Sequence, residues 1–299
     1  MYKHFLTSVL LVFFMLSCSK PSPFEGKMRE SVQTSLSWRN DTTGIWETAG
    51  WWNSANVLTA TIRYGAVTKD PAIPSVIEDV FEKARHYQVG VDSTGTPRYC
   101  DNFINDYYDD EGWWALAWIE ASKLTGEKKY LDMAEIIFDD MTTGWSDACG
   151  GGIFWKKNPL HYKNSIANNL FSLTAIRLYK ATQNPAYLDW FKKNVDWYTQ
   201  TGMINTDIYQ IEDGTKDDCT PNRNAHYTYN QGVAIAVLAE MYLQTNDKSY
   251  LELAEKIADA TITTQLVTDE GILREMKPEI DDSNDGVQFK GIFIRHLAF

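Results

Sequence analysis

The chain has 299 residues, with 28 basic and 40 acidic side chains and a formal net charge of −12. This charge repels nucleic acid and anionic lipid headgroups, so both are excluded as partners and a neutral ligand is favoured. Hydrophobic residues make up 44% of the chain, which excludes a disordered protein and allows one sizeable core.

The N-terminus has the pattern of an export signal. Lys3 and His4 precede an apolar run over 5–16, which is too short to span a bilayer but suits a signal peptide. A serine then precedes Cys18, as in the lipobox of bacterial lipoproteins, where the cysteine is acylated after cleavage. An ordinary cleaved signal peptide with an incidental cysteine is the alternative.

From this pattern we predict a signal peptide over 1–17 and a lipidated N-terminus and linker over 18–28. The exported protein would be held by its lipid anchor on the periplasmic face or the outer surface of a bacterial membrane, and the anchor would be its sole contact with the membrane.

Apolar residues at helical spacing predict helices over 29–38, 51–64 and 74–87. An internal repeat follows, in which an apolar helix, a short polar turn and the dipeptide Tyr-Leu lead into an amphipathic helix. The tyrosines of these three dipeptides are Tyr130, Tyr187 and Tyr250.

The two helices of each repeat differ in character. The first is apolar on all sides, as in 232–239, whereas the second has a charged face, as in 252–259. A helix that is apolar all round must be covered on both sides. We therefore predict an all-α (α/α)6 toroid over 29–299, with an inner ring of apolar helices inside an outer ring of amphipathic ones. The sequence ends within a predicted inner helix, so we expect the last helices of a closed six-pair ring to be missing.

Three cysteines follow the predicted anchor: Cys100, Cys149 and Cys219. They lack C-x-x-C spacing, and neither they nor His161 and His226 form a metal-binding motif, so we expect no metal site and no other cofactor. In an oxidising compartment one pair is able to form a disulfide and leave one thiol over. The sequence alone leaves the pairing open. We expect a monomer.

The loops that lead into the predicted inner helices are rich in aromatic, amide and hydroxyl side chains. In a toroid these loops meet at one mouth, where amides bind hydroxyl groups and aromatic rings stack on the C–H faces of sugars. Most of the eleven Trp and sixteen Tyr are nevertheless expected in the core. Our candidates for substrate contact are Trp51, Trp52, Asn56, Tyr107, Trp113, Asn168, Asn169, Tyr229, Gln231 and Lys290.

Among these loops, one carries two consecutive carboxylates, Asp109 and Asp110. Neighbouring Cα atoms are about 3.8 Å apart, and diverging side chains bring carboxyl separations near 5 Å within reach. Retaining glycosidases use a spacing of roughly 5–5.5 Å, whereas inverting enzymes need about 6.5–9.5 Å. We therefore predict that these two aspartates are catalytic and that the sugar's anomeric configuration is retained.

A structural role for the pair is the alternative. Asp at a helix start is an ordinary N-cap, and Glu111 in the first turn complements the helix dipole. The acidic pairs at 139–140, 217–218 and 281–282 are not framed by aromatic residues, so we predict no catalytic role for them.

The segment 107–114, Tyr-Tyr-Asp-Asp-Glu-Gly-Trp-Trp, resembles the consecutive aspartates and Trp-rich inner helix of glycoside hydrolase family 76, the endo-α-1,6-mannanase family. The resemblance runs over 38–299 and implies an (α/α)6 fold with retaining, metal-free hydrolysis of α-1,6-mannosidic linkages in mannan. By position, Asp109 would be the nucleophile and Asp110 the general acid/base. Supporting motifs, in the family's order, lie at 51–56, 150–155, 163–169, 229–232 and 289–291.

Two other kinds of protein remain open. A non-catalytic glycan-binding lipoprotein would use the same aromatic mouth, but it has no need of a carboxylate pair. Another (α/α)-toroid carbohydrate enzyme, acting on charged uronides, would call for more basic side chains at the mouth than Lys163, Lys290 and Arg223.

Overall fold

The computed structural model describes residues 23–91, 94–157, 162–223, 225–264, 266–277 and 285–298. The predicted signal peptide over 1–17 and Cys18 lie outside the described residues, as does His161. No described helix is long and apolar enough to cross a membrane.

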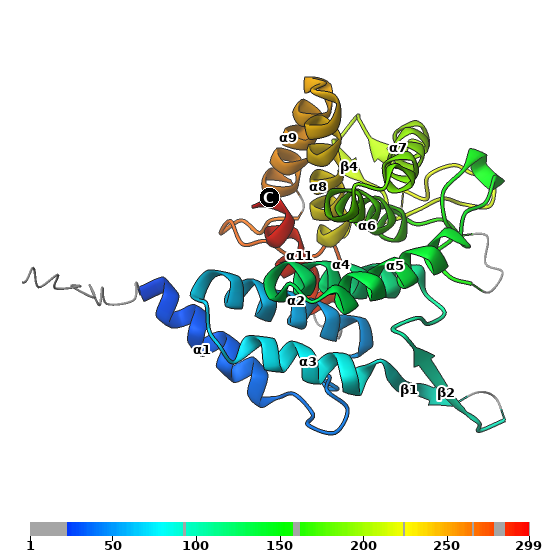
Figure 1. The fold of residues 1–299 in the computed structure, drawn as a ribbon. Coiled ribbons are helices and arrows are strands. Elements are labelled where there is room, and N and C mark those ends of the chain that lie inside the picture. Colours follow the sequence, from blue (N-terminus) through cyan, green and yellow to red (C-terminus); the bar gives the residue numbers. More distant parts are fainter. Residues whose placement is uncertain are drawn as a thin grey trace, which may run out of the picture.

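The described helices form an inner and an outer set (Figure 1). Each inner helix contacts the next one along the chain, so α2 lies beside α4, α4 beside α6, α6 beside α8 and α8 beside α11. This arrangement confirms the predicted all-α fold of paired inner and outer helices. The inner helices are α2 (Trp51–Thr68), α4 (Tyr108–Thr125), α6 (Ser165–Thr182), α8 (Thr228–Thr245) and α11 (Gly286–Leu297). The outer helices are α3 (Ile73–Ala84), α5 (Lys128–Thr142), α7 (Pro185–Gln200) and α9 (Lys248–Thr263).

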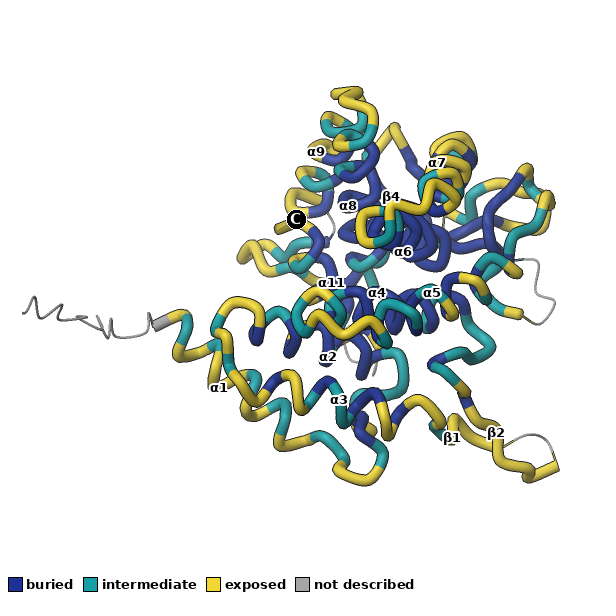
Figure 2. The backbone as a smooth tube through the Cα atoms, in the orientation of Figure 1, coloured by how far each residue is buried: buried dark blue, intermediate teal, exposed yellow. Residues whose placement is uncertain are grey.

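The inner helices hold most of the core, as the buried segments of Figure 2 show. Two glycines let neighbouring inner helices approach closely. A Cβ at Gly112 of α4 would lie 2.7 Å from the Leu170 side chain of α6, and one at Gly232 of α8 would lie 2.6 Å from the backbone of Phe293 of α11. Both distances are too short for a real Cβ, so the helix spacing depends on these glycines.

The repeat seen in the sequence reappears at the ends of the inner helices. Helices α2, α4, α6 and α8 each end on a residue with left-handed backbone, which satisfies a carbonyl of the last turn. These residues are Lys69, Gly126, Gln183 and Asn246. Asn184 and Asp247 then cap α7 and α9 by accepting hydrogen bonds from backbone N–H groups. The polar turns of the sequence are therefore the points at which the chain reverses.

The repeated tyrosines join neighbouring outer helices. Tyr130 at the start of α5 donates to Glu78 of α3 (2.7 Å), and Tyr187 at the start of α7 donates to Glu135 of α5 (2.9 Å). In two of the three repeats, the tyrosine thus fixes a new outer helix against the preceding one.

Two features differ from the sequence prediction. Helix α1 (Pro23–Ser37) begins six residues before the predicted helix and takes in most of the predicted linker. No strand is predicted from the sequence, whereas β1 (His86–Val91) and β2 (Pro97–Asp101) form an antiparallel hairpin that projects from the helices (Figure 1). A second, shorter pair joins β3 (Ile204–Asn205) to β4 (Gln210–Ile211). Alternation of apolar and polar residues over so few positions is a weak strand signal, and the neighbouring helical patterns are much stronger.

Candidate active site

A cleft of about 410 Å³ lies where the first turns of the inner helices meet. Each of the five inner helices, or the loop that leads into it, contributes to its wall, so the predicted mouth is present. Eight of the lining residues are aromatic and four are aspartates. The lining residues are Trp52, Tyr107, Asp109, Asp110, Trp113, Trp155, Tyr162, Asn164, Asp213, Tyr227, Tyr229, Asp285 and Phe289.

Asp109 and Asp110 lie in the first turn of α4 and are held by separate donors. The indole N–H of Trp155 donates to Asp109 Oδ2 (3.1 Å), and the side-chain amide of Asn105 donates to Asp110 Oδ2 (2.6 Å). The second oxygen of Asp109, Oδ1, is buried without a hydrogen-bond partner. This oxygen is available to a group that enters the cleft.

The two carboxyl groups have raised pKa values. Burial raises the pKa of Asp109 to about 7, and the charge of Asp213 adds to this effect, while the Trp155 indole and backbone N–H groups act in the opposite direction. Burial also raises the pKa of Asp110 well above its usual range, and the neighbouring charge of Asp109 raises it further. Both carboxyl groups of the pair therefore hold a proton more readily than an ordinary aspartate does.

Helix capping does not account for this pair. The N-cap of α4 is Tyr107, which makes no side-chain cap bond, and its own N–H donates to Asn105 Oδ1 (2.8 Å). The structural carboxylate of this turn is Glu111, which is fully buried and pairs with Lys157 (2.7 Å). Lys157 also pairs with Asp140 (2.6 Å), so these three residues fix the start of α4 against the end of α5.

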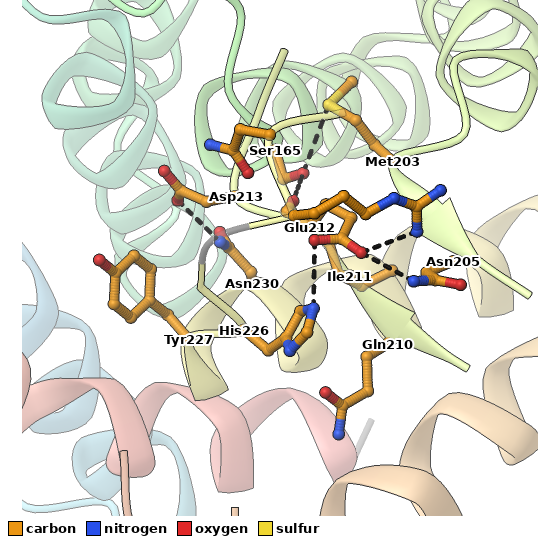
Figure 3. Close-up of polar contacts among 12 residues, drawn as sticks. Ser165, Met203, Asn205, Gln210, Ile211, Glu212, Asp213, His226, Tyr227 and Asn230 are labelled. Atoms are coloured by element: carbon orange, nitrogen blue, oxygen red, sulfur yellow. Dashed lines mark hydrogen bonds and ion pairs between the residues drawn. The ribbon is translucent and has the colours of Figure 1, made fainter. Parts of the chain in front are cut away.

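The wall that includes Asp213 faces α4 and comes from the loop before α8. The Tyr162 hydroxyl donates to Asp213 Oδ2 (2.5 Å). The side-chain amide of Asn230 donates to Asp213 Oδ1 (3.1 Å), and Figure 3 shows this second bond. Asn222 donates to the Tyr162 hydroxyl in turn (3.0 Å). Burial raises the pKa of Asp213, although its two donors oppose this.

We expect Asp213→Asn to move the acid limb of the activity profile to lower pH. The negative charge of Asp213 raises the pKa of Asp109, so its removal lets Asp109 ionise at lower pH. The measurement is kcat/KM against pH, with the exposed Asp218→Asn of the same loop as the matched control. An unchanged acid limb in Asp213→Asn would show that the two carboxyl groups are not coupled.

Glu212, next to Asp213, is fully buried and structural. It accepts from Asn205 (2.8 Å) and contacts His226 (3.1 Å), as Figure 3 shows, and it pairs with Arg223 (2.9 Å). These contacts fix the strand pair and the loop that carries Asp213.

Lys163 is a buried cation bound by backbone. Its ammonium group donates to the carbonyl oxygens of Ser146 (2.6 Å), Ala148 (2.6 Å) and Gly152 (2.9 Å), and also to that of Gly151. Burial lowers the pKa of Lys163 to about 8. The side chain therefore folds the loop that carries Trp155 into place and does not reach the cleft.

Of the three cysteines, Cys149 and Cys219 form a disulfide. The bond joins the loop that carries Trp155 to the loop that carries Asp213, so it ties two walls of the cleft together. Cys100 is a buried free thiol whose pKa burial raises to about 12, which makes it unreactive.

We expect loss of the disulfide to lower the free energy of unfolding by about 2–4 kcal/mol, because the bond closes a long loop. Urea unfolding of the double variant Cys149→Ser, Cys219→Ser tests this. The control variant Cys100→Ala leaves the disulfide intact, so a reductant should lower its stability as it lowers that of the native chain. Equal stability of the double variant and the native chain would contradict the expectation.

The structure places six of the predicted site residues in the cleft. They are Asp109, Asp110, Trp52, Tyr107, Trp113 and Tyr229. The ring of Trp52 stacks near Trp113 (5.9 Å between centroids), and Tyr229 stacks on Phe289 (3.9 Å).

The other six predicted residues do not line the cleft. Trp51 is packed between Tyr87 and Trp114 (5.0 and 5.1 Å between centroids). Asn56 lies further along α2, where it accepts from Arg295 (2.6 Å). Lys290 follows Phe289 on α11 outside the cleft wall.

The remaining three of these are buried amides with structural roles. Asn168 accepts from the backbone N–H of Ile153 (2.8 Å), and Asn169 donates to the Ser165 carbonyl (2.9 Å). Gln231 accepts from the N–H of Ile211 (2.8 Å) and donates to its carbonyl (3.0 Å). Asn168 and Gln231 thus hold neighbouring segments, Asn169 bonds within its own helix, and none of the three lines the cleft.

Several lining residues were not selected from the sequence. Tyr162, Asn164, Tyr227 and Phe289 lie in the segments that the sequence marked as entries to the inner helices. The sequence pattern gives a weaker indication for the two aspartates. Asp213 precedes a glycine in a polar loop, and Asp285 stands at the start of a predicted helix. Asp285 accepts from the Trp52 indole (3.0 Å), a contact between α2 and the start of α11.

A helical toroid whose inner-helix starts surround two adjacent carboxyl groups and eight aromatic side chains has the architecture of a glycoside hydrolase. The family model of glycosyl hydrolase family 76 matches residues 25–299, and the chain belongs to this family.

Similar proteins agree with this assignment. The chain is 29% identical over 206 residues to the mannan endo-1,6-alpha-mannosidase DCW1 of Saccharomyces cerevisiae, covering 64% of this chain and 45% of the relative. It is 25% identical over 265 residues to the DCW1 enzyme of Candida albicans, covering 83% and 57%. The GH76A alpha-1,6-mannanase of Salegentibacter sp. HEL1_6 superposes with a TM-score of 0.77 at 26% identity, covering 91% of this chain and 79% of that one. The chain thus spans about half the length of the curated relatives it matches.

Proposed function

We propose that this protein is a retaining glycoside hydrolase that cleaves α-1,6-mannosidic linkages in mannan. The observation that carries the proposal is the half-buried pair Asp109 and Asp110, whose separate donors and raised pKa values suit two different catalytic roles. The names of the similar yeast and Salegentibacter enzymes support α-1,6-mannan as the substrate.

In the first step Asp109, as a carboxylate, attacks the anomeric carbon, while Asp110, as the acid, protonates the departing glycosidic oxygen. The Trp155 indole favours the ionised form of Asp109, and the charge of Asp109 keeps a proton on Asp110. Once Asp109 is esterified its charge is gone, so the pKa of Asp110 falls and Asp110 becomes a base. It then takes a proton from the water that cleaves the ester bond.

The cleft suits a neutral sugar. Its wall combines aromatic faces with the amide of Asn164, and among the described residues no Lys or Arg lines it. This lining does not favour charged uronides. Two adjacent carboxyl groups with raised pKa values also disfavour simple glycan capture, because holding them together costs free energy that binding alone does not require.

The test is incubation with unbranched α-1,6-mannan and, in parallel, with α-1,2- and α-1,3-linked mannooligosaccharides. We expect reducing ends to appear from the α-1,6-linked substrate. Binding of mannan without any release of sugar would favour a glycan-binding protein instead.

We also propose that the chain is exported and anchored through an acyl group on Cys18 at a bacterial membrane. The apolar run over 5–16 and the serine before Cys18 support this. Cys18→Ala should leave the protein in the soluble fraction after cell lysis, whereas the native chain should sediment with membranes. Equal partition of the two proteins would contradict lipidation.

A further inference from the structure

A second cavity adjoins the cleft beneath the β1–β2 hairpin. We call it the hairpin pocket; its volume is about 260 Å³. Its walls come from the hairpin, from the start of α2 and from the turn before α4. They consist of Trp51, Val89, Arg98, Tyr99, Asn105, Asp106, Tyr107 and Asp110.

Two residues, Tyr107 and Asp110, line both the cleft and the hairpin pocket. Asp109 lines the cleft but is not part of the hairpin pocket. Asp110 therefore lies at the boundary between the two cavities, whereas Asp109 lies on the side of the cleft.

This distribution has a chemical consequence that rests on the proposed function. A general acid contacts the glycosidic oxygen, which joins the sugar under attack to the sugar that departs. If Asp110 protonates this oxygen from the boundary, the two sugars lie on opposite sides of Asp110. The sugar attacked by Asp109 occupies the cleft, and the departing sugar lies toward the hairpin pocket.

The walls of the hairpin pocket suit a neutral hexose. Tyr99 is 48% exposed and stacks on His86 (4.4 Å between centroids), so its ring is fixed in place while part of it remains open to solvent. Arg98 and Asp106 form an ion pair, so their charges balance while both retain hydrogen-bonding capacity. Asn105 orients Asp110 from the same wall.

We propose that the hairpin pocket binds the hexose unit on the leaving-group side of the scissile bond, and that Tyr99 and Arg98 determine the preference for a sugar leaving group. The β1–β2 hairpin is then part of the substrate-binding site.

The experiment compares two substrates that differ on the leaving-group side alone. One is an α-1,6-linked mannotetraose, and the other is α-1,6-mannobiosyl fluoride, which places no sugar beyond the bond that breaks. We expect Tyr99→Ala and Arg98→Ala each to lower kcat/KM on the tetraose by about three- to tenfold, with less than a twofold change on the fluoride. Val91→Ala, at an exposed position of the same hairpin outside the pocket, should match the native chain on both substrates.

Other results would overturn the assignment. Equal losses on both substrates would mean that the hairpin only supports the fold, and no loss on either would mean that the pocket is not used. A native chain that cleaves neither substrate would contradict the proposed function itself, and with it the assignment of the hairpin pocket to the leaving-group sugar.

Discussion

Asp109→Asn and Asp110→Asn are each expected to lower the rate of release of sugar from α-1,6-mannan by about a thousandfold. Asparagine keeps the shape of the side chain but can neither attack the anomeric carbon nor transfer a proton. The measurement is kcat on linear α-1,6-mannooligosaccharides, with Asp139→Asn as an exposed acidic control. Activity within tenfold of the native chain in either variant would contradict a catalytic pair.

The two roles can be separated with a small nucleophile. Asp110→Ala opens space beside the anomeric carbon once the glycosyl ester has formed on Asp109. Azide should then restore turnover with an activated aryl mannoside and yield an azide product of the substrate's own configuration. Asp109→Ala, treated in the same way, should give the opposite configuration. If the two products were exchanged, the roles of the aspartates would be exchanged as well.

Asp109→Asn is also expected to stabilise the protein at pH 8 but not at pH 4. The native pKa of about 7 lies above the ordinary value of 3.8, so the folded state binds the proton more tightly than the unfolded chain. The stability that this proton supplies is complete below pH 4 and is lost as the pH rises through 7. The difference corresponds to at most about 4 kcal/mol at pH 8.

Urea unfolding at pH 4 and pH 8 measures this effect. The native chain should lose stability between the two values, and Asp109→Asn should lose less. The exposed Asp139→Asn serves as the control and should follow the native chain. A variant as pH-sensitive as the native chain would show that Asp109 is not strained by its burial. We expect such strain at a catalytic site, because a carboxylate that is stable in its pocket is a poor nucleophile.

Much of the fold could be predicted because the repeat gives several independent signals for the same helices. Apolar first helices, polar turns and the tyrosines at 130, 187 and 250 all indicated paired inner and outer helices. The hairpin was missed because its strands are short and lie between two strong helical patterns. The pairing of Cys149 with Cys219 also needed the fold, since it depends on where two distant loops meet.

The site was predicted in part, for a physical reason. A residue's position in an entry loop places it near the cleft, but its hydrogen-bond partner decides the direction of its side chain. Asn168 and Gln231 lie at the expected starts of α6 and α8, yet they are buried and satisfy backbone groups of Ile153 and Ile211. Asp213 lies outside the conspicuous motifs but reaches the cleft, because Tyr162 and Asn230 hold it there. Side-chain direction of this kind depends on contacts between segments that are far apart in sequence.

The central proposal is that Asp109 and Asp110 cleave an α-1,6-mannosidic bond through a glycosyl ester. Proton NMR of the first sugar released from an α-1,6-linked oligosaccharide, recorded before mutarotation, tests it most directly. We predict that the α-anomer appears first and the β-anomer later. A β-anomer as the initial product would show direct attack by water with inversion, and would contradict the assignment of Asp109 as the nucleophile.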